Sequence, residues 1–258
     1  PDSFSDGGAF AGPDDAIAHA RELRAQGAAI IDVGGESTRP GAQRVPVEEE
    51  LGRVRPVVAA LAGDGTAVSI DTMNARTALA AVEAGAVIVN DVSGGLADPE
   101  LLSAVAGTGA DIVLGHWRGP SSDMYARAEY AHVGREVAAE LLDRVAAAQA
   151  AGIPPSRIIV DPGIGFAKTA EQNWALLESL GDIVALGHRV LLGTSRKRFL
   201  GDALGPDAST RRRDAATAVT SVLADAAGVW AVRVHDVAST RDALAVAGAW
   251  KSGARGLP

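Results

Sequence analysis

The feature that most constrains the fold is a unit that recurs along the chain. A short β-branched run ends in a polar residue or glycine, and an alanine-rich stretch with spaced apolar positions follows. Such runs predict strands at residues 29–33, 68–72, 87–92, 112–116, 158–162, 190–195 and 231–236. They read as buried on both faces, which is typical of a parallel sheet. Helices are predicted between them at residues 14–26, 48–62, 75–84, 137–151, 171–180 and 214–227.

Repeated strand–helix units fit two architectures, an open doubly wound sheet and a closed barrel of eight strands. The chain opens on a loop-like segment, Pro-Asp-Ser-Phe-Ser-Asp-Gly-Gly. We therefore expect the first strand of the barrel to be missing before residue 1. The prediction is an α/β fold, a (β/α)8 TIM barrel that forms a single domain over residues 1–258. The basic run 211–213 is read as a solvated loop before a helix that opens at Asp214.

Charge and cysteine content disfavour several classes of function. A formal net charge of −8 gives no sequence-wide basic field for nucleic acid or an anionic membrane. Because cysteine is absent, the chain has no disulfide framework, thiolate metal site or cysteine nucleophile, and a reducing cytoplasm is the expected location. The apolar runs are too short to span a bilayer. The first residue is Pro1 rather than Met, which leaves an upstream targeting segment open.

Polar residues fall repeatedly at the carboxyl ends of the predicted strands. Asp71, Asn90 and Asp161 hold such positions, as do Arg233 and His235. In a barrel these ends meet on the face that carries the active site. One aspartate alone would be read as a turn former, but several together favour a site. The first three form a rigid set of donors and acceptors, suited to the edge of a flat heterocycle with amino, ring N–H and carbonyl groups.

Cations lie at the ends of two further strands. The segment 193–197 ends in Lys197, which could reach over the barrel mouth toward a carbonyl or an anion. Arg233 and His235 lie two positions apart, so they share a face and could hold an anion such as diphosphate together. Asp32 and His116 occupy similar positions at strand ends. The sequence leaves open whether these two are structural or functional.

Two loops carry more polar chemistry than simple connections need, at residues 1–8 and 34–41. Glycine and proline supply a hinge-like backbone, while Asp6, Thr38 and Arg39 could close over a bound anion. The alternative is that these segments are plain connectors. The sequence contains no dinucleotide fingerprint, phosphate loop, HExxH motif or serine elbow.

Taken together, seven segments resemble the motif series of the dihydropteroate synthases, within the wider group of pterin-binding barrels. They are PDSFSDGG from Pro1, DVGGESTRPG from Asp32, SIDT from Ser69, VNDVSGG from Val89, DPGIGF from Asp161, SRK from Ser195 and RVH from Arg233. The series spans nearly the whole chain in the family's order. The two loop motifs and Ser-Arg-Lys are the specific ones, because the wider group shares mainly the Asp and Asn positions.

The resemblance implies a cytoplasmic, homodimeric transferase of folate synthesis that uses Mg²⁺. Its substrates would be 6-hydroxymethyl-7,8-dihydropterin diphosphate and 4-aminobenzoate, and its products 7,8-dihydropteroate and diphosphate. Sulfonamides compete at the aminobenzoate site in this family. Two other readings stay open: a folate-dependent methyltransferase of the same group, which the Ser-Arg-Lys and Thr-Arg-Pro motifs disfavour, and a paralogue that binds without turnover, which the intact site residues disfavour.

The resemblance also assigns the site residues. The pterin pocket would comprise Asp71, Asn90, Asp161, Phe166 and Lys197. Diphosphate would be held by Arg39, Arg233 and His235, and 4-aminobenzoate would lie among Phe4, Thr38, Pro40, Ser195 and Lys197. The catalytic residues would be Lys197, Arg233, His235, Asp6 and Arg39, with Asp6 stabilising a cation on the pterin methylene. The family's magnesium-linked Asn is expected upstream of Pro1, and Gly115, where the family usually has Met, predicts a looser pocket wall.

Overall fold

The computed structural model describes residues 12–37, 44–119, 128–205 and 207–253. Within these ranges seven parallel strands form one sheet whose spatial order follows the chain. They are β1 Ile30–Gly34, β2 Ala67–Asp71, β3 Ile88–Asp91, β4 Asp111–Gly115, β5 Ile158–Asp161, β6 Arg189–Leu192 and β7 Ala231–Val232. All seven predicted strands are therefore present, although β7 ends four residues earlier than the predicted range.

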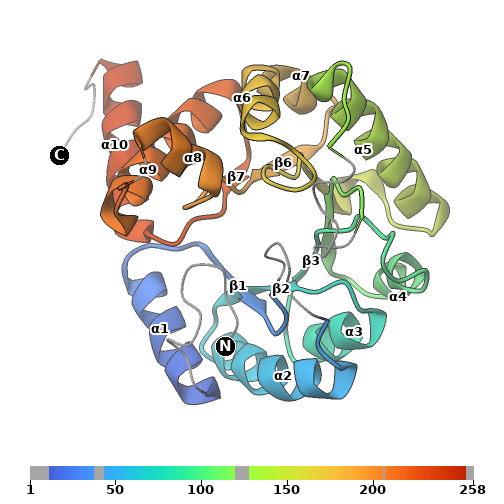
Figure 1. Cartoon of the computed structure of the whole chain (residues 1–258). Helices are drawn as coiled ribbons and strands as arrows, with labels where there is room; N and C mark the ends of the chain where they lie inside the picture. The colour runs from blue at the N-terminus through green and yellow to red at the C-terminus, as the bar shows by residue number, and fades with distance from the viewer. Residues whose placement is uncertain (1–11, 38–43, 120–127, 206, 254–258) are drawn as a thin grey trace.

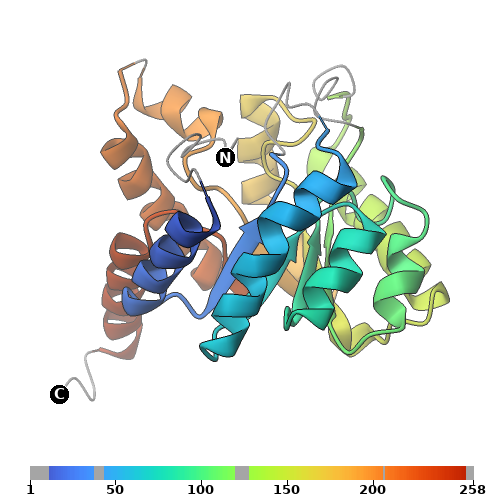
Figure 2. The same ribbon diagram turned by 90° about the horizontal axis from the view of Figure 1, so that it is seen from below.

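Helices form a ring around the outside of the strands (Figure 1). They are α1 Pro13–Ala25, α2 Val47–Gly63, α3 Ala75–Glu83, α4 Leu101–Ala106, α5 Val133–Ala150, α6 Ala170–Glu178, α7 Leu180–Val184, α8 Arg198–Leu204, α9 Thr210–Ala227 and α10 Val237–Ser252. The neighbouring helices α1 and α2, in blue, lie side by side along the sheet (Figure 2). Among the described residues no helix is long and apolar enough to cross a membrane.

The start of α9 corrects one prediction. The basic run 211–213 belongs to the first turn of this helix rather than to a loop, because α9 begins at Thr210. Ser209 caps the helix by accepting a hydrogen bond from the backbone N–H of Arg212. The cap satisfies an otherwise unpaired donor, and this local gain outweighs the unfavourable placement of cations at a helix N-terminus.

The sheet is curled, although β1 and β7 are its two edge strands in the part of the chain that is described. Arg233, directly after β7, donates from Nε to Asp32 Oδ2 of β1 at 2.6 Å, across 201 positions of sequence. An open doubly wound sheet holds its edge strands far apart. The architecture is therefore a TIM-barrel-like α/β fold, and a further strand between these edges stays a prediction.

Two aliphatic layers pack on the strands. The larger one lies between sheet and helices and includes Val68, Ile112 and Val160. A smaller cluster joins Ile88, Val113 and Ile159 with the partly buried Ile30 and Leu191. Because successive side chains of a strand point to opposite faces, this second cluster is the packed interior of the barrel. It forms an apolar floor beneath the carboxyl ends of the strands.

Candidate active site

The side chains of Asp32, Asn90 and Asp161 point into the barrel above this floor. Each lies two positions beyond a residue of the interior cluster on its own strand, and strand residues two apart share a face. Asp71 joins them, because it lies in register with Asn90 of the next strand. The structure thus brings together three of the five pterin-pocket candidates, Asp71, Asn90 and Asp161, and it adds Asp32.

Arg233 spans two of these carboxylates. Its Nη2 lies 3.1 Å from Asp71 Oδ2, in addition to the 2.6 Å contact of its Nε with Asp32. Asn90 Nδ2 donates to the same Asp32 oxygen at 3.1 Å. The Arg233 side chain keeps 46% of its surface exposed, against 9% for the side chain of Asp71. A solvent-accessible cation therefore covers one buried and one partly buried carboxylate at the barrel mouth.

Burial perturbs the charges of this group. It raises the pKa of Asp71 above the usual range, and the neighbouring Asp32 carboxylate adds to the rise while Arg233 opposes it. The same two aspartates raise the pKa of Arg233, Asp32 most of all. Ionised Asp71 is therefore poorly solvated where it lies, so its charge depends on donors from Arg233 or from a ligand.

Asp161 and Lys197 form the other half of the site. Asp161 Oδ1 accepts a hydrogen bond from the backbone N–H of Gly163 at 2.7 Å, and burial raises the pKa of this carboxyl. Burial lowers the pKa of Lys197 to about 8, and the negative charge of Asp161 counteracts the fall. Lys197 Nζ donates to the carbonyl of Ile164 and lies 5.0 Å from the ring centroid of Phe166. The segment after β5 thus folds back over the lysine.

Ser195 and His235 contact each other rather than standing apart. Ser195 Oγ lies 2.7 Å from His235 Nδ1 and accepts the backbone N–H of His235 at 3.1 Å. A hydroxyl that accepts this N–H can donate its own proton to Nδ1, which places the ring proton on Nε2. The residue that the resemblance assigns to aminobenzoate is therefore a neighbour of one assigned to diphosphate.

The remaining residues singled out in the sequence differ in outcome. Phe4, Asp6, Thr38, Arg39 and Pro40 lie outside the described residues. The looser wall at Gly115 is wrong, because a Cβ at this position would lie 2.5 Å from the carbonyl oxygen of Val92, so backbone fills the space. Asp32, whose role the sequence left open, proves to be a direct partner of Arg233; its position two residues beyond an interior aliphatic was the available signal.

The described part of the chain contains no group of three or more His, Cys, Asp or Glu side chains placed to hold a metal ion. One carboxylate oxygen in the site lacks a partner among the described residues: Asp32 Oδ1 is buried without a hydrogen bond. Mg²⁺ commonly binds through one or two carboxylates together with substrate phosphates and water. Asp32 therefore fits a supporting ligand better than a member of a complete protein cage.

Comparisons with known proteins agree with this geometry. Residues 1–235 match the family profile described as pterin binding enzyme. Over 253 residues the chain is 54% identical to the dihydropteroate synthase of Mycobacterium leprae (strain TN), which covers 96% of this chain and 89% of that protein. The solved Xanthomonas albilineans dihydropteroate synthase with 4-aminobenzoic acid aligns at 42% identity and a TM-score of 0.88, over 99% of this chain and 89% of the other.

A second solved structure gives the same relationship. The Yersinia pestis dihydropteroate synthase, determined as a sulfonamide drug complex, aligns with a TM-score of 0.93 at 36% identity and covers 98% of this chain and 91% of its own. Both the profile and the M. leprae relative extend over most of the chain, including the strand ends that carry the polar residues. This chain therefore belongs to the dihydropteroate synthase family of pterin-binding enzymes.

Proposed function

We propose that the chain is a dihydropteroate synthase, a transferase that joins 6-hydroxymethyl-7,8-dihydropterin diphosphate to 4-aminobenzoate in folate synthesis. The observation that carries the proposal is the grouping of Asp71, Asn90 and Asp161 inside the barrel beneath the exposed side chain of Arg233. Short polar groups suit the edge of a pterin, and a solvent-facing cation suits the attached diphosphate. The M. leprae relative and the X. albilineans complex with 4-aminobenzoic acid support this function.

The pterin would lie across the mouth of the barrel. Asp161 would accept hydrogen bonds from the amino and ring N–H groups, and Asn90 and Asp71 would bind the remaining polar edge. Lys197 would donate to the ring carbonyl or a ring nitrogen, with Phe166 beside it. Because the pKa of Asp161 is raised by burial, donors supplied by the ligand would stabilise the carboxylate more than they would in water.

The diphosphate would be held by Arg233 and His235. To reach it, Arg233 exchanges its contacts with Asp32 and Asp71 for phosphate oxygens, and Asp71 becomes available to the pterin. His235 would donate from Nε2, since Ser195 holds its Nδ1. Arg39 would add a second guanidinium from its loop.

The reaction is a substitution at the methylene carbon of the pterin. The carbon–oxygen bond to diphosphate breaks with both electrons leaving on oxygen, the arylamine nitrogen forms the new carbon–nitrogen bond, and the amine then loses a proton to water. Cations at the leaving group lower this barrier by stabilising the developing negative charge, so Arg233, His235 and Arg39 would act electrostatically. Asp6 would stabilise positive charge on the methylene, and no covalent bond to the protein is needed.

The second substrate would bind nearer the outer edge of the mouth. We assign 4-aminobenzoate to Phe4, Thr38, Pro40, Ser195 and Lys197. Of these residues the structure describes Ser195 and Lys197, which lie on the same turn after β6. Sulfonamides would compete here, and the Y. pestis relative solved as a drug complex supports that expectation.

Mg²⁺ is the proposed cofactor. It would neutralise charge on the leaving diphosphate, whose oxygens would supply most of its ligands. Asp32 offers an unpartnered carboxylate oxygen on the protein side. We also propose a cytoplasmic location, since the sequence lacks cysteine and the reaction belongs to folate synthesis.

A homodimer is the proposed assembly, and an apolar surface on the last two helices supports it. Val219 and Leu223 lie four positions apart on α9, as Val246 and Trp250 do on α10, so each pair shares one helix face. These side chains are exposed, Trp250 at 87% and Val246 at 68%. The two helices pack side by side (Figure 1). Large apolar side chains exposed on two neighbouring helices are consistent with an interaction site, and a second copy of this chain is the partner we assign.

Diphosphate release tests the function. The chain, with Mg²⁺ present, should release diphosphate only when the pterin diphosphate and 4-aminobenzoate are both supplied. Release without the arylamine would indicate hydrolysis and contradict the proposal. Arg233→Lys serves as a matched variant, because it keeps the positive charge but loses the planar guanidinium that binds phosphate through two parallel hydrogen bonds. The rate of diphosphate release should therefore fall.

A further inference from the structure

We propose that Lys168 is a positioning residue for pterin binding. Its ammonium donates hydrogen bonds to carbonyl groups of residues 161–166 and so sets the shape of this segment. His116 in turn holds the ammonium in place. The inference rests on the proposed function, because it concerns how the pterin pocket is formed. Neither residue is among those that the resemblance assigns to a ligand. Lys168 does not belong to the pocket lining; it lies behind the segment that provides Asp161 and Phe166.

Lys168 is a buried ammonium with all its donors occupied. The residue is 1% exposed. Its Nζ lies 3.0 Å from each of three acceptors, which are the carbonyl oxygens of Gly163 and Phe166 and the Nδ1 of His116. A lysine ammonium has three N–H groups, so three acceptors satisfy it completely. An amine in this place without these partners would be strongly disfavoured.

The segment that Lys168 holds has a backbone that needs support. Gly163, Gly165 and Ala167 all have positive φ angles, of 66°, 82° and 48°. Ala167 is one of two non-glycine residues with positive φ in the described part of the chain. Glycine adopts such angles freely, whereas at Ala167, directly before Lys168, the conformation persists only where the surrounding structure imposes it. Two carbonyl groups fixed by one buried ammonium provide that restraint.

The restrained segment forms the pterin side of the site. Its first residue is Asp161, whose carboxylate binds the N–H of Gly163, and Lys168 binds the carbonyl of the same glycine. Further along, Lys197 contacts the carbonyl of Ile164 and the ring of Phe166. A change in this backbone would therefore displace both the acceptor for the pterin and the aromatic wall beside it.

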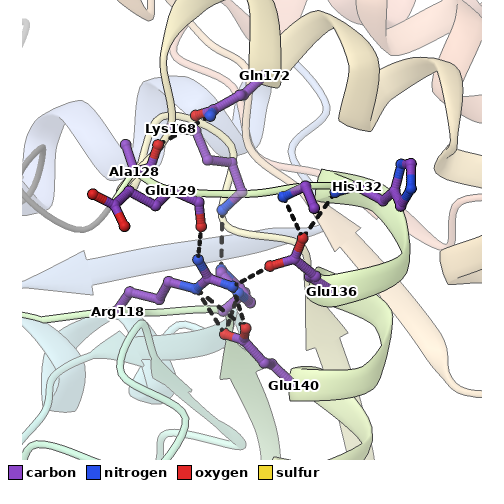
Figure 3. A network of polar contacts seen from close by, with 10 residues as sticks. Arg118, Ala128, Glu129, His132, Glu136, Glu140, Lys168 and Gln172 are labelled. Carbon is purple, nitrogen blue, oxygen red and sulfur yellow. Dashed lines mark hydrogen bonds and ion pairs between the residues drawn. The ribbon is translucent and has the colours of Figure 1, made fainter.

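A second set of contacts fixes His116. Because Nδ1 accepts from Lys168, the ring proton lies on Nε2, which donates to Glu140 Oε2 at 2.9 Å. Figure 3 shows Arg118 pointing toward Glu140 and Glu136 of α5, and Arg118 also donates to the carbonyl of Glu129 at 2.6 Å. The network thus anchors the end of β4 to α5. The charged or titratable groups around Lys168 in the described part of the chain are His116, Arg118, Tyr130, Glu140, Asp161 and Lys197.

Burial also perturbs the charges of this pair. It lowers the pKa of Lys168 to about 7, against the attraction of Asp161. Burial and the lysine charge together lower the pKa of His116 to about 4. Both shifts disfavour protonation of the two side chains together, and Glu140, which contacts the other ring nitrogen, opposes the fall in the pKa of His116.

Arg157 offers a matched control at the opposite end of the same strand. It precedes β5 and also donates to three carbonyl oxygens, those of Val105, Thr108 and Ala110, at 2.6–2.9 Å. None of its partners belongs to the proposed site. If Lys168 has a purely structural role, loss of Lys168 and loss of Arg157 should affect stability and ligand affinity in the same way. If Lys168 is a positioning residue, only its own loss should lower pterin affinity.

The test compares Lys168→Met with Arg157→Met by calorimetry, using 6-hydroxymethylpterin and inorganic diphosphate as separate ligands. Lys168→Met should weaken the pterin about tenfold or more and leave diphosphate affinity within about twofold. Arg157→Met should lower the melting temperature and change neither affinity beyond about twofold. Pterin affinity that is unchanged in Lys168→Met, or a parallel loss for both ligands, would overturn the proposal.

A second variant keeps the test decisive if Lys168→Met does not fold. His116→Phe removes one acceptor of the ammonium and retains both carbonyl bonds, so it should weaken the pterin selectively but less than Lys168→Met. Lys168→Arg, which restores a cation with several donors, should recover part of the pterin affinity. If the unsubstituted chain binds no pterin, the proposed function is wrong. If it binds pterin and His116→Phe binds it equally well, only the positioning role is wrong.

Discussion

The substitution Asp161→Asn tests the pterin half of the site with the least change in shape. Asp161 Oδ1 accepts the N–H of Gly163 at 2.7 Å. The asparagine must therefore direct its oxygen to Gly163 and its amide NH₂ group to the pocket. The pterin would then meet a donor where its own N–H groups need an acceptor. Rotation about the terminal bond would turn the amide oxygen to the pocket but would place the NH₂ group against the N–H of Gly163. Neither orientation therefore satisfies both partners.

The magnitude follows from the contacts that are lost. A charge-assisted hydrogen bond contributes about 1.5–3 kcal/mol, and a tenfold change in affinity corresponds to about 1.4 kcal/mol. The substitution removes one of the two hydrogen bonds to the pterin and removes the negative charge that strengthens the other. Pterin binding should therefore weaken on the order of 100-fold, with or without the diphosphate. Folding stability should not fall, because burial raises the pKa of Asp161 and the neutral side chain avoids that penalty.

Arg233→Ala is the comparison, because it removes a cation whose side chain is 46% exposed and lies at the mouth. Calorimetry with the free pterin and with its diphosphate ester separates the two subsites. Arg233→Ala should weaken the ester about 10- to 100-fold and reduce the salt dependence of ester binding; it should not weaken the free pterin, because it also releases Asp71 for the pterin. If both variants lose affinity for both ligands to a similar degree, the pterin and diphosphate subsites have been assigned wrongly.

Other expectations concern titration and assembly. The pKa of Lys197 is lowered to about 8, so pterin affinity should fall as pH rises through that value; because Asp161 opposes the lowering, Asp161→Asn should move the fall to lower pH in a calorimetric series. The folded-state pKa of Lys168 is about 7, below its ordinary 10.5, so the unfolded chain binds more protons than the folded chain between these pH values. The unfolding free energy should therefore rise with pH across this window. Urea titrations should find a larger rise in the wild type than in Lys168→Met. Light scattering should find a dimer, and Leu223→Asp combined with Trp250→Asp should give a folded monomer; a monomeric wild type would exclude the dimer.

The sequence predicts the strands and the face on which polar residues gather. The pattern of β-branched runs ending in Asp71, Asn90 and Asp161 places these residues at strand ends, and the period-two alternation directs them inward. These are local properties of each strand. The predicted helices are also present, and the range 171–180 corresponds to α6. In the described part of the chain α4, α8 and α10 lie outside the predicted ranges, and α7 overlaps one of them at residue 180 only.

The remaining features depend on contacts that local sequence does not encode. The pairing of Asp32 with Arg233 joins positions 201 apart and requires the sheet to curl. Lys168 reaches His116 only because β4 and β5 are neighbours. The short helix α4, with six residues, is below the length at which apolar periodicity is informative. The roles of the outer loop residues stay predictions.

Arg233 is already bound by the carboxylates of Asp32 and Asp71. If Arg233 binds diphosphate as proposed, the anion must displace these carboxylates. The measured affinity would then be the intrinsic affinity reduced by the fraction of molecules in which Arg233 is released. Weakening the internal competitor would therefore tighten the hold on diphosphate. Diphosphate is also a product of the proposed reaction and must leave after every turnover. When Asp32 binds Arg233 again, it would shorten the time for which diphosphate stays bound.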